Sequence, residues 1–286
     1  MKIIKYFFEF IIISFLFFIY KILGLKISSY ISGKLFEFFG PLFRSKEIIR
    51  SNIRRAIPEI NLKEINNIKK NMWNNYGRTL SEYMFLKNFR INSLKSNINI
   101  KGKEILEQIK LEKNPVIFIS GHFSNFELMA MQIEKSGVNL AAIYRPLNNM
   151  FLNVLMERIR TKYICKKQIK KGASGVRELL KLYKKGYSIA LMIDQRVSEG
   201  IKSRFFGEDA FTTTIPAQFV KKFNCKIVPI YIKRFDDINF NIRIEKPLEF
   251  SKNTSTEKIT RDLNIWLEKM ILKNPGEWIW SHNRWK

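Results

Sequence analysis

The sequence predicts an α/β fold, with a mostly parallel sheet flanked by helices and an N-terminal membrane-anchoring helix. Three observations predict it: strand and helix patterns alternate after about residue 100, conspicuous polar residues directly follow several strands, and the first 25 residues are mostly apolar. Alternation of this kind is typical of parallel sheets with helices on both faces. We therefore expect an anchor over residues 1–25, a helical membrane-associated region over 26–100 and an α/β domain over 101–286.

The apolar N-terminal segment runs for twenty residues, from Tyr6 to Leu25, and is interrupted by Glu9 and Lys21. This length is about what a helix needs to span a bilayer. The small residues of a signal-peptide cleavage site do not follow it. A spanning helix and an interfacial helix both remain open, because Glu9 suits the second.

Basic residues are unevenly distributed around this segment. Only Lys2 and Lys5 precede it. Seven basic residues follow it closely: Lys26, Lys34, Arg44, Lys46, Arg50, Arg54 and Arg55. Positive charge concentrates on the cytoplasmic side of membrane proteins, so we expect the α/β domain on the cytoplasmic side of the membrane.

Two further helical stretches follow. The segment from Tyr30 to Phe43 carries Phe36, Phe38, Phe39, Leu42 and Phe43 beside basic residues, which suits either a core helix or a second membrane contact. Residues Leu62 to Leu86 are predicted to form one helix.

The α/β domain is predicted from short β-branched runs that alternate with helical periodicity. The expected strands are Val116–Ser120, Leu140–Tyr144, Ser188–Ile193, Lys226–Ile232 and Phe240–Ile244. The expected helices are Asn125–Lys135, Asn149–Lys162, Ser174–Lys185, Ile215–Phe223 and Ser255–Lys273.

Polar residues follow three of these strands at the point where each ends. His122 follows the first strand, Arg145 the second, and Asp194, Gln195 and Arg196 the third. In open parallel sheets ligands bind beyond the carboxyl ends of the strands. The sequence therefore predicts that these side chains converge on one site.

His122 is one of only two histidines in 286 residues, and histidine is the side chain best suited to proton transfer near neutral pH. On a straight helix, residues five apart lie roughly 140° apart, so His122 and Glu127 would not meet. Ser124 and Glu127 match a capping box, which would make Ser124 the N-cap and leave His122 in the turn before the helix. A folded-back turn of this kind can bring the two side chains together. A structural role for His122 and a simple capping role for Glu127 remain alternatives.

Charge and cysteine content narrow the function classes. The formal net charge is +26, which attracts polyanions such as nucleic acid, anionic lipid or an acidic carrier protein. Cys165 and Cys225 have no disulfide-framework spacing, so a reducing compartment is expected. The second histidine, His282, is expected to be exposed, and no paired spacing predicts a metal site.

An ordered set of motifs resembles one enzyme family. The motifs are Gly121-His-Phe-Ser-Asn-Phe-Glu127, Tyr144-Arg-Pro146 with Asn148, Asp194-Gln195, Phe205-Phe-Gly207, Thr213-Thr-Ile-Pro216, Val228-Pro229 and the tryptophan-rich tail Pro275–Lys286. With the anchor, they resemble the lipid A late (lauroyl/myristoyl) acyltransferases, within the lysophospholipid acyltransferase-like superfamily. The resemblance implies a glycerolipid acyltransferase-like αβα fold.

The resemblance also implies a reaction. A fatty acyl chain would move from an acyl-carrier-protein thioester to a hydroxyl of a phosphorylated glucosamine lipid, a lipid A precursor. His122 would be the general base, and Glu127 would orient it and stabilise the imidazolium. No cofactor is expected beyond acyl-carrier protein or acyl-CoA as co-substrate.

Other residues of these motifs are expected to bind substrate. Arg145 is the leading candidate for a phosphate contact, its alternative being a surface arginine at a helix start. Asn125, Asp194, Gln195 and Arg196 complete the expected substrate-binding set. Phe205 suits either the wall of an acyl channel or a packed loop.

Three competing functions deserve comparison. A related acyltransferase would use a lysophospholipid or another glycolipid as acceptor. A membrane-tethered nucleic-acid binder would explain the +26 charge, but the basic residues are spread along the chain and form no recognisable module, so no nucleic-acid partner is expected. A non-catalytic membrane scaffold gives no reason for His122 and Glu127 to flank a strand-to-helix turn.

Overall fold

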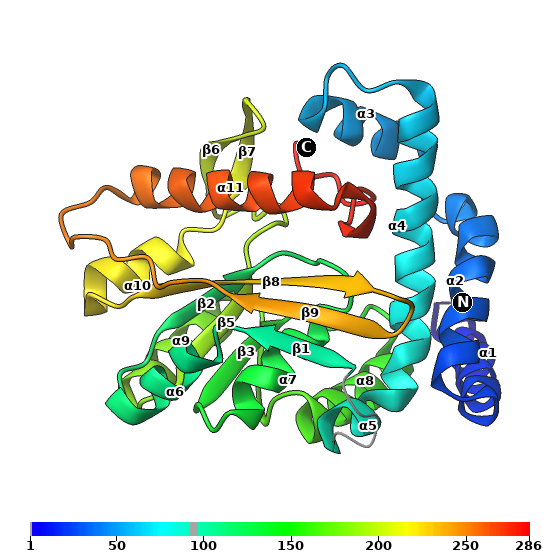
Figure 1. Cartoon of the computed structure of the whole chain (residues 1–286), viewed down its shortest axis with the longest axis horizontal. Coiled ribbons are helices and arrows are strands. Elements are labelled where there is room, and N and C mark those ends of the chain that lie inside the picture. Colours follow the sequence, from blue (N-terminus) through cyan, green and yellow to red (C-terminus); the bar gives the residue numbers. More distant parts are fainter. Residues whose placement is uncertain (1, 92–96) are drawn as a thin grey trace.

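The computed structural model describes residues 2–91 and 97–286 (Figure 1). Met1 of the predicted anchor and residues 92–96 of the predicted helical region lie outside the described residues. The described part of the chain forms a seven-stranded sheet and a separate two-stranded hairpin. The sheet strands are β1 (Ile98–Lys101), β2 (Ile117–Ser120), β3 (Leu140–Tyr144), β4 (Lys167–Lys170), β5 (Ser188–Met192), β8 (Ile227–Phe235) and β9 (Asn239–Ile244), and the hairpin strands are β6 (Ile201–Phe205) and β7 (Glu208–Thr212).

The order of the sheet strands is β1-β9-β8-β2-β5-β3-β4. Every neighbouring pair is parallel except β8 and β9, which are antiparallel. Strands β9 and β1 are parallel to each other and run in the direction opposite to the other five strands. The predicted α/β fold with a mostly parallel sheet is therefore confirmed. Strand β2 is buried at all four positions, as expected for an apolar run covered on both faces.

Helices cover both faces of this sheet. They are α6 (Lys103–Glu112), α7 (Glu127–Lys135), α8 (Met150–Tyr163), α9 (Ala173–Lys184), α10 (Ile215–Phe223) and α11 (Thr256–Lys273). Figure 1 shows α10 and α11 on one side of the sheet and α6 and α9 on the other. The 3-10 turn η3 (Pro275–Glu277) starts the C-terminal tail, in which Trp278 and Trp280 are buried.

The N-terminal part is helical. It comprises α1 (Lys2–Leu23), α2 (Leu25–Phe39), the 3-10 turn η1 (Gly40–Leu42), α3 (Lys46–Ala56), α4 (Leu62–Glu82), the 3-10 turn η2 (Tyr83–Phe85) and α5 (Leu86–Ile91). Figure 1 shows α4 standing at the end of the sheet toward which β8 points, with α2 beside it. The α2–α4 contact needs glycine at Gly77, because a Cβ there would come within 2.1 Å of the Ser32 carbonyl oxygen. Gly24, with φ of +76°, separates α1 from α2.

Several local predictions were wrong. Helix α7 begins at Glu127, with Phe126 as its N-cap, and Ser124 makes no capping box. Ser124 instead has φ of +46°, and its N–H donates to the Glu277 carbonyl oxygen, because the C-terminal tail packs against this turn. One helix was predicted from Leu62 to Leu86, but α4 ends at Glu82 and is followed by the 3-10 turn η2. Strands β1, β4, β6 and β7 were not predicted, because short polar strands lack the apolar signal.

Candidate active site

His122 lies in the turn that follows β2, and Asp194 lies just beyond the end of β5, the neighbouring strand. The His122 ring Nδ1 is 2.8 Å from Asp194 Oδ1, and the His122 backbone N–H donates to Asp194 Oδ2 at 2.8 Å. Adjacent parallel strands bring these two residues together at one sheet edge, as the strand-end prediction requires.

Asp194 is fully buried and ionised. Burial opposes its ionisation, but the charge of His122, the two hydrogen bonds from His122 and a third from Trp278 Nε1 at 2.9 Å hold the pKa of the Asp194 carboxyl below its ordinary value. An ionised carboxylate only accepts hydrogen bonds, so His122 Nδ1 carries the hydrogen of this bond. In the neutral form of the ring the lone pair then lies on Nε2, from which the ring can act as a base.

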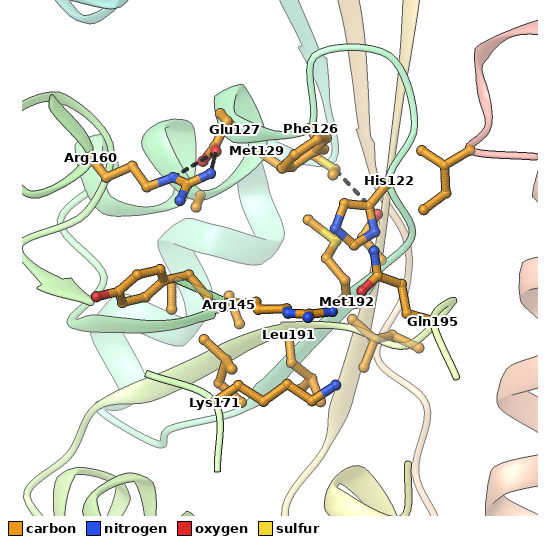
Figure 2. Close-up of a pocket in the computed structure, with 18 of the residues that line it drawn as sticks. His122, Phe126, Glu127, Met129, Arg145, Arg160, Lys171, Leu191, Met192 and Gln195 are labelled. Carbon is orange, nitrogen blue, oxygen red and sulfur yellow. Dashed lines mark hydrogen bonds and ion pairs between the residues drawn. The ribbon is translucent and has the colours of Figure 1, made fainter. Parts of the chain in front are cut away.

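Glu127 was predicted to meet and orient the His122 ring, but its hydrogen bonds go to other residues. Its Oε1 accepts hydrogen bonds from Arg160 Nε at 2.9 Å and Nη2 at 2.7 Å, and from the Tyr83 hydroxyl. The reason is local geometry: Glu127 is the first residue of α7, and its side chain reaches toward Arg160 on α8. Figure 2 shows this pair set apart from the imidazole within the same cavity. The residue that orients the His122 ring is Asp194.

A cavity of about 510 Å³ lies in front of His122, and its wall includes Glu127, Arg145, Arg160 and Gln195. Its interior is apolar; this part of the wall consists of Phe118, Ile119, Met129, Ile133, Ala142, Ile164, Ala190 and Leu191. The cavity combines a base, several cations and an apolar interior, a set suited to an amphipathic anionic substrate.

A second, outer cavity of about 690 Å³ adjoins the first, and Arg44, Arg145 and Lys171 line both. We call these three residues the cationic neck. Burial and then the nearby charge of Arg145 lower the pKa of Lys171, as expected where like charges are held together. Figure 2 shows the Arg145 and Lys171 side chains extending along the cavity toward the side where His122 lies.

The remaining predicted substrate residues divide between the cavities and the interior. Gln195 lines the inner cavity and Arg196 the outer one. Asn125, also predicted to bind substrate, is fully buried; its amide donates to Glu82 Oε2 at 2.9 Å, and it lines neither of these two cavities. Asp194 also lines neither cavity, because it lies behind the imidazole that it holds.

His282 was expected to be exposed, but it is half-buried and lines both cavities. Its Nε2 accepts the Arg196 backbone N–H at 3.0 Å, which leaves the proton of the neutral ring on Nδ1. Burial, with contributions from nearby positive charges, lowers the pKa of His282 to about 4. The tail that carries it folds back over the strand ends, a long-range contact that no local sequence pattern indicates.

One further residue, Arg160, follows from the folded chain alone. It was missed because its position on α8 is distinguished only by partners distant in sequence.

Phe205 was expected either to line an acyl channel or to lie in a packed loop. It packs in the interior, its ring centroid 5.4 Å from that of Trp285, and does not line the inner cavity.

Comparison with known proteins identifies the family. The model of the bacterial lipid A biosynthesis acyltransferase family matches residues 1–286. The chain is 20% identical to the lipid A biosynthesis palmitoleoyltransferase of Escherichia coli (strain K12), over 86% of this chain and 80% of that one. It is 23% identical to the lipid A biosynthesis lauroyltransferase of the same organism, over 85% and 79%. It is 22% identical to lipid A biosynthesis acyltransferase 2 of Shigella flexneri, over 63% of this chain and 58% of that one. Because the family match covers the whole chain, the protein belongs to the bacterial lipid A biosynthesis acyltransferase family.

Proposed function

We propose that the protein transfers a fatty acyl chain from an acyl-carrier-protein thioester to a hydroxyl group of a lipid A precursor, at the cytoplasmic face of the inner membrane. The observation that carries this proposal is the buried Asp194 carboxylate behind His122, in a cavity that joins an apolar interior to a cationic neck. The His122–Asp194 pair suits a general base, the apolar interior suits an acyl chain, and the cationic neck suits a phosphorylated acceptor.

His122 acts as the general base. Its Nε2 accepts the proton of the acceptor hydroxyl while the hydroxyl oxygen attacks the thioester carbonyl carbon. The new C–O bond forms as the carbonyl electrons move onto oxygen; the C–S bond then breaks, and the carrier thiolate takes the proton back from His122. Proton transfer of this type contributes about 10²–10⁴ in rate. Asp194 holds the ring in the required tautomer and balances the charge of the imidazolium.

Glu127 acts through Arg160 in this proposal. The two hydrogen bonds from the Arg160 guanidinium to Glu127 fix a positive charge in the cavity wall. Burial disfavours the charged form, but Tyr83 and Glu127 outweigh it and raise the pKa of Arg160 above its ordinary value. A fixed positive charge in a partly dry cavity stabilises the negative charge that develops on the thioester carbonyl oxygen or on bound substrate.

The cationic neck receives the phosphate of the acceptor. Arg145 was the phosphate ligand expected from the sequence, and Arg44 and Lys171 stand beside it around the same opening. Arginine and lysine are the usual partners of phosphate oxygens, and several cations held together at one opening favour a multiply charged anion. The apolar interior behind His122 is the place for the acyl chain.

The direct test is a reaction with purified protein. Acyl-carrier-protein thioester and a lipid A precursor are incubated with the wild-type chain and with His122→Ala, and the lipids are analysed by mass spectrometry. The expected product carries one additional acyl ester, and His122→Ala forms at least about 100-fold less of it. Near wild-type turnover by His122→Ala would show that the base is misassigned. Transfer to a lysophospholipid but not to the lipid A precursor would favour the related acyltransferase with another acceptor.

A further inference from the structure

Helix α1 is attached to the folded domain near its N-terminus. The Asn149 amide donates to the Tyr6 carbonyl oxygen at 2.8 Å and to Glu9 Oε2 at 3.1 Å. The rings of Phe7 and Phe10 lie 5.7 and 6.0 Å from the ring of Phe151, between centroids. These contacts join the first half of α1 to the start of α8.

The second half of α1 is attached as well. Phe17 and Tyr20 are only 4% and 1% exposed. The Tyr20 hydroxyl donates to Ser32 Oγ on α2 at 2.8 Å. Helix α1 therefore follows the surface of the protein from Tyr6 to Tyr20, a length of roughly 21 Å at 1.5 Å per residue.

Attachment at both ends conflicts with a helix that crosses the bilayer. A rise of roughly 21 Å is most of the hydrocarbon thickness of about 30 Å, so a crossing α1 would carry the start of α8 deep into the membrane. Helix α8 carries the charged residues Glu157, Arg158 and Arg160 within three turns of its start. Charged side chains are costly to place in the hydrocarbon interior of a bilayer. Helix α8 therefore belongs outside the hydrocarbon, and α1 stays beside it.

The outward face of α1 is apolar, and the neighbouring α2, η1 and start of α8 also expose apolar side chains. On α1 the exposed residues are Ile3, Ile4, Phe7, Phe8, Ile11, Ile12, Phe15, Phe18 and Ile22. On α2, η1 and the residue after it they include Ile27, Tyr30, Leu35, Phe38, Phe39, Leu42 and Phe43; at the start of α8 they are Leu147, Met150 and Val154. We call this set the membrane-facing surface. Lys5, Lys21 and Lys26 interrupt or border it, as on helices that lie on anionic membranes.

We propose that α1 lies in the plane of an anionic phospholipid surface, with both of its ends on the side of the catalytic domain, and that the active-site cavity opens at that surface. Leu147 of the membrane-facing surface lines the inner cavity and Phe43 the outer one, and Arg145 lines both. A lipid acceptor then reaches the cationic neck without leaving the leaflet. The proposal rests on the proposed function for the identity of the lipid, but the position of α1 is measured without any transfer reaction.

The experiment locates the N-terminal end of α1. Spheroplasts that express the full chain with Lys2→Cys are treated with a membrane-impermeant maleimide, before and after lysis. Lys252→Cys, an exposed site of the catalytic domain, is the matched control, and the parent chain gives the background from the buried Cys165 and Cys225. Labelling of both variants only after lysis is expected. Labelling of Lys2→Cys in intact spheroplasts would show that α1 crosses the membrane, and protection until detergent is added would place the N-terminus inside the bilayer; either result overturns the proposal.

Cross-linking tests the attachment to α8 independently. In native membranes the pair Phe7→Cys/Phe151→Cys is expected to join with a short bifunctional maleimide, because the two rings are in contact. The control pair Phe18→Cys/Phe151→Cys is not expected to join, because Phe18 is 62% exposed on the outward face. Equal yields from both pairs, or none from the first, would show that α1 leaves the domain in the membrane. Failure of acyl transfer to lipid A with these results intact would refute the proposed substrate and leave the position of α1 standing.

Discussion

His122, the proposed general base, has the buried Asp194 carboxylate behind its ring. Both oxygens of Asp194 are used, one by the ring and one by the backbone N–H of the same residue, so the imidazole is fixed in both position and tautomer. Trp278 adds a third hydrogen bond from the C-terminal tail. A carboxylate that is fully buried and satisfied in this way fixes the orientation of its histidine and is placed to balance the charge of the ring.

Asp194→Asn should therefore impair catalysis nearly as much as loss of the histidine. The neutral amide cannot balance the imidazolium, and it does not fix which ring nitrogen is the base. We expect kcat to fall by roughly 10²–10⁴ while KM for the acceptor stays within a few fold. Steady-state kinetics of the purified variants measure both parameters.

Non-additivity distinguishes Asp194 from Glu127. Residues that act as one unit lose little more in the double variant than in the single ones. Asp194→Asn combined with His122→Ala should be no slower than His122→Ala alone. If instead Glu127→Gln, and not Asp194→Asn, abolished the pH dependence of kcat, Glu127 would be the residue coupled to His122.

Glu127→Gln should reduce stability as well as rate. The Arg160 side chain is only 13% exposed, and without the Glu127 carboxylate its charge is left unbalanced in the protein. Breaking one partner of a buried ion pair costs about 3–5 kcal/mol. We expect a lower unfolding midpoint in detergent for Glu127→Gln, and a smaller loss when Arg160→Met is combined with it, because the unpaired charge is then gone. An unchanged midpoint in the single variant would contradict the proposed role of the pair.

His282 should make the stability of the protein depend on pH. Its pKa is about 4 in the folded protein and about 6.5 ordinarily, so the unfolded chain binds the proton more readily between these values. The contribution of the neutral ring is complete above about pH 6.5 and is lost as the pH falls toward about 4. The melting temperature should decrease less between pH 7 and pH 5 for His282→Gln than for the wild type. Equal decreases would show that His282 is protonated as easily in the folded state as in the unfolded chain.

At the scale of the elements, the sequence predicts where the site lies but not which side chains meet in it. His122 and Asp194 each follow an apolar strand, so their convergence follows from parallel pairing of neighbouring strands. The partner of His122 could not be predicted, because it depends on β5 lying directly beside β2 in the sheet order. The capping-box prediction for Ser124 was also wrong because of a long-range contact: the Ser124 N–H donates to the carbonyl oxygen of Glu277, 153 positions away in the chain. Local patterns carry no information about such contacts.

The outward face of α1 is expected to carry most of the membrane affinity. Phe8, Phe15 and Phe18 are 60%, 63% and 62% exposed, so their replacement leaves the contacts with α2 and α8 in place. In the triple variant Phe8→Glu/Phe15→Glu/Phe18→Glu, three of the exposed apolar residues of α1 are replaced by charged ones. We expect the variant to shift from the membrane pellet to the soluble fraction, with an unchanged far-ultraviolet circular dichroism spectrum. Retention in the pellet after high-salt washing would assign anchoring to the α2–η1 part of the membrane-facing surface.

At the scale of the whole molecule, the dominant property is the net charge of +26. Such a charge creates a long-range field that raises the encounter rate with anionic partners and is screened by salt, with a Debye length of about 10 Å at 0.1 M. In the proposed reaction, the phosphate of the acceptor and the acidic surface expected of the carrier-protein donor would both respond to this field. The two effects are separable, because the proposed acceptor would be delivered by the membrane and the proposed donor by diffusion.

The donor's share of this effect can be measured by varying its charge. With acyl-carrier protein as donor, kcat/KM should fall steeply, by about an order of magnitude or more, between 50 and 500 mM salt, because screening slows an electrostatically steered encounter. With acyl-pantetheine, an uncharged donor with the same thioester, kcat/KM should change little over that range. Acyl-CoA, which carries phosphates but no protein surface, should fall between the two. The acceptor is held in vesicles of constant composition throughout, so any salt effect on the membrane is shared by all three donors. Equal salt dependence for acyl-carrier protein and acyl-pantetheine would show that the positive surface serves the membrane and not the donor.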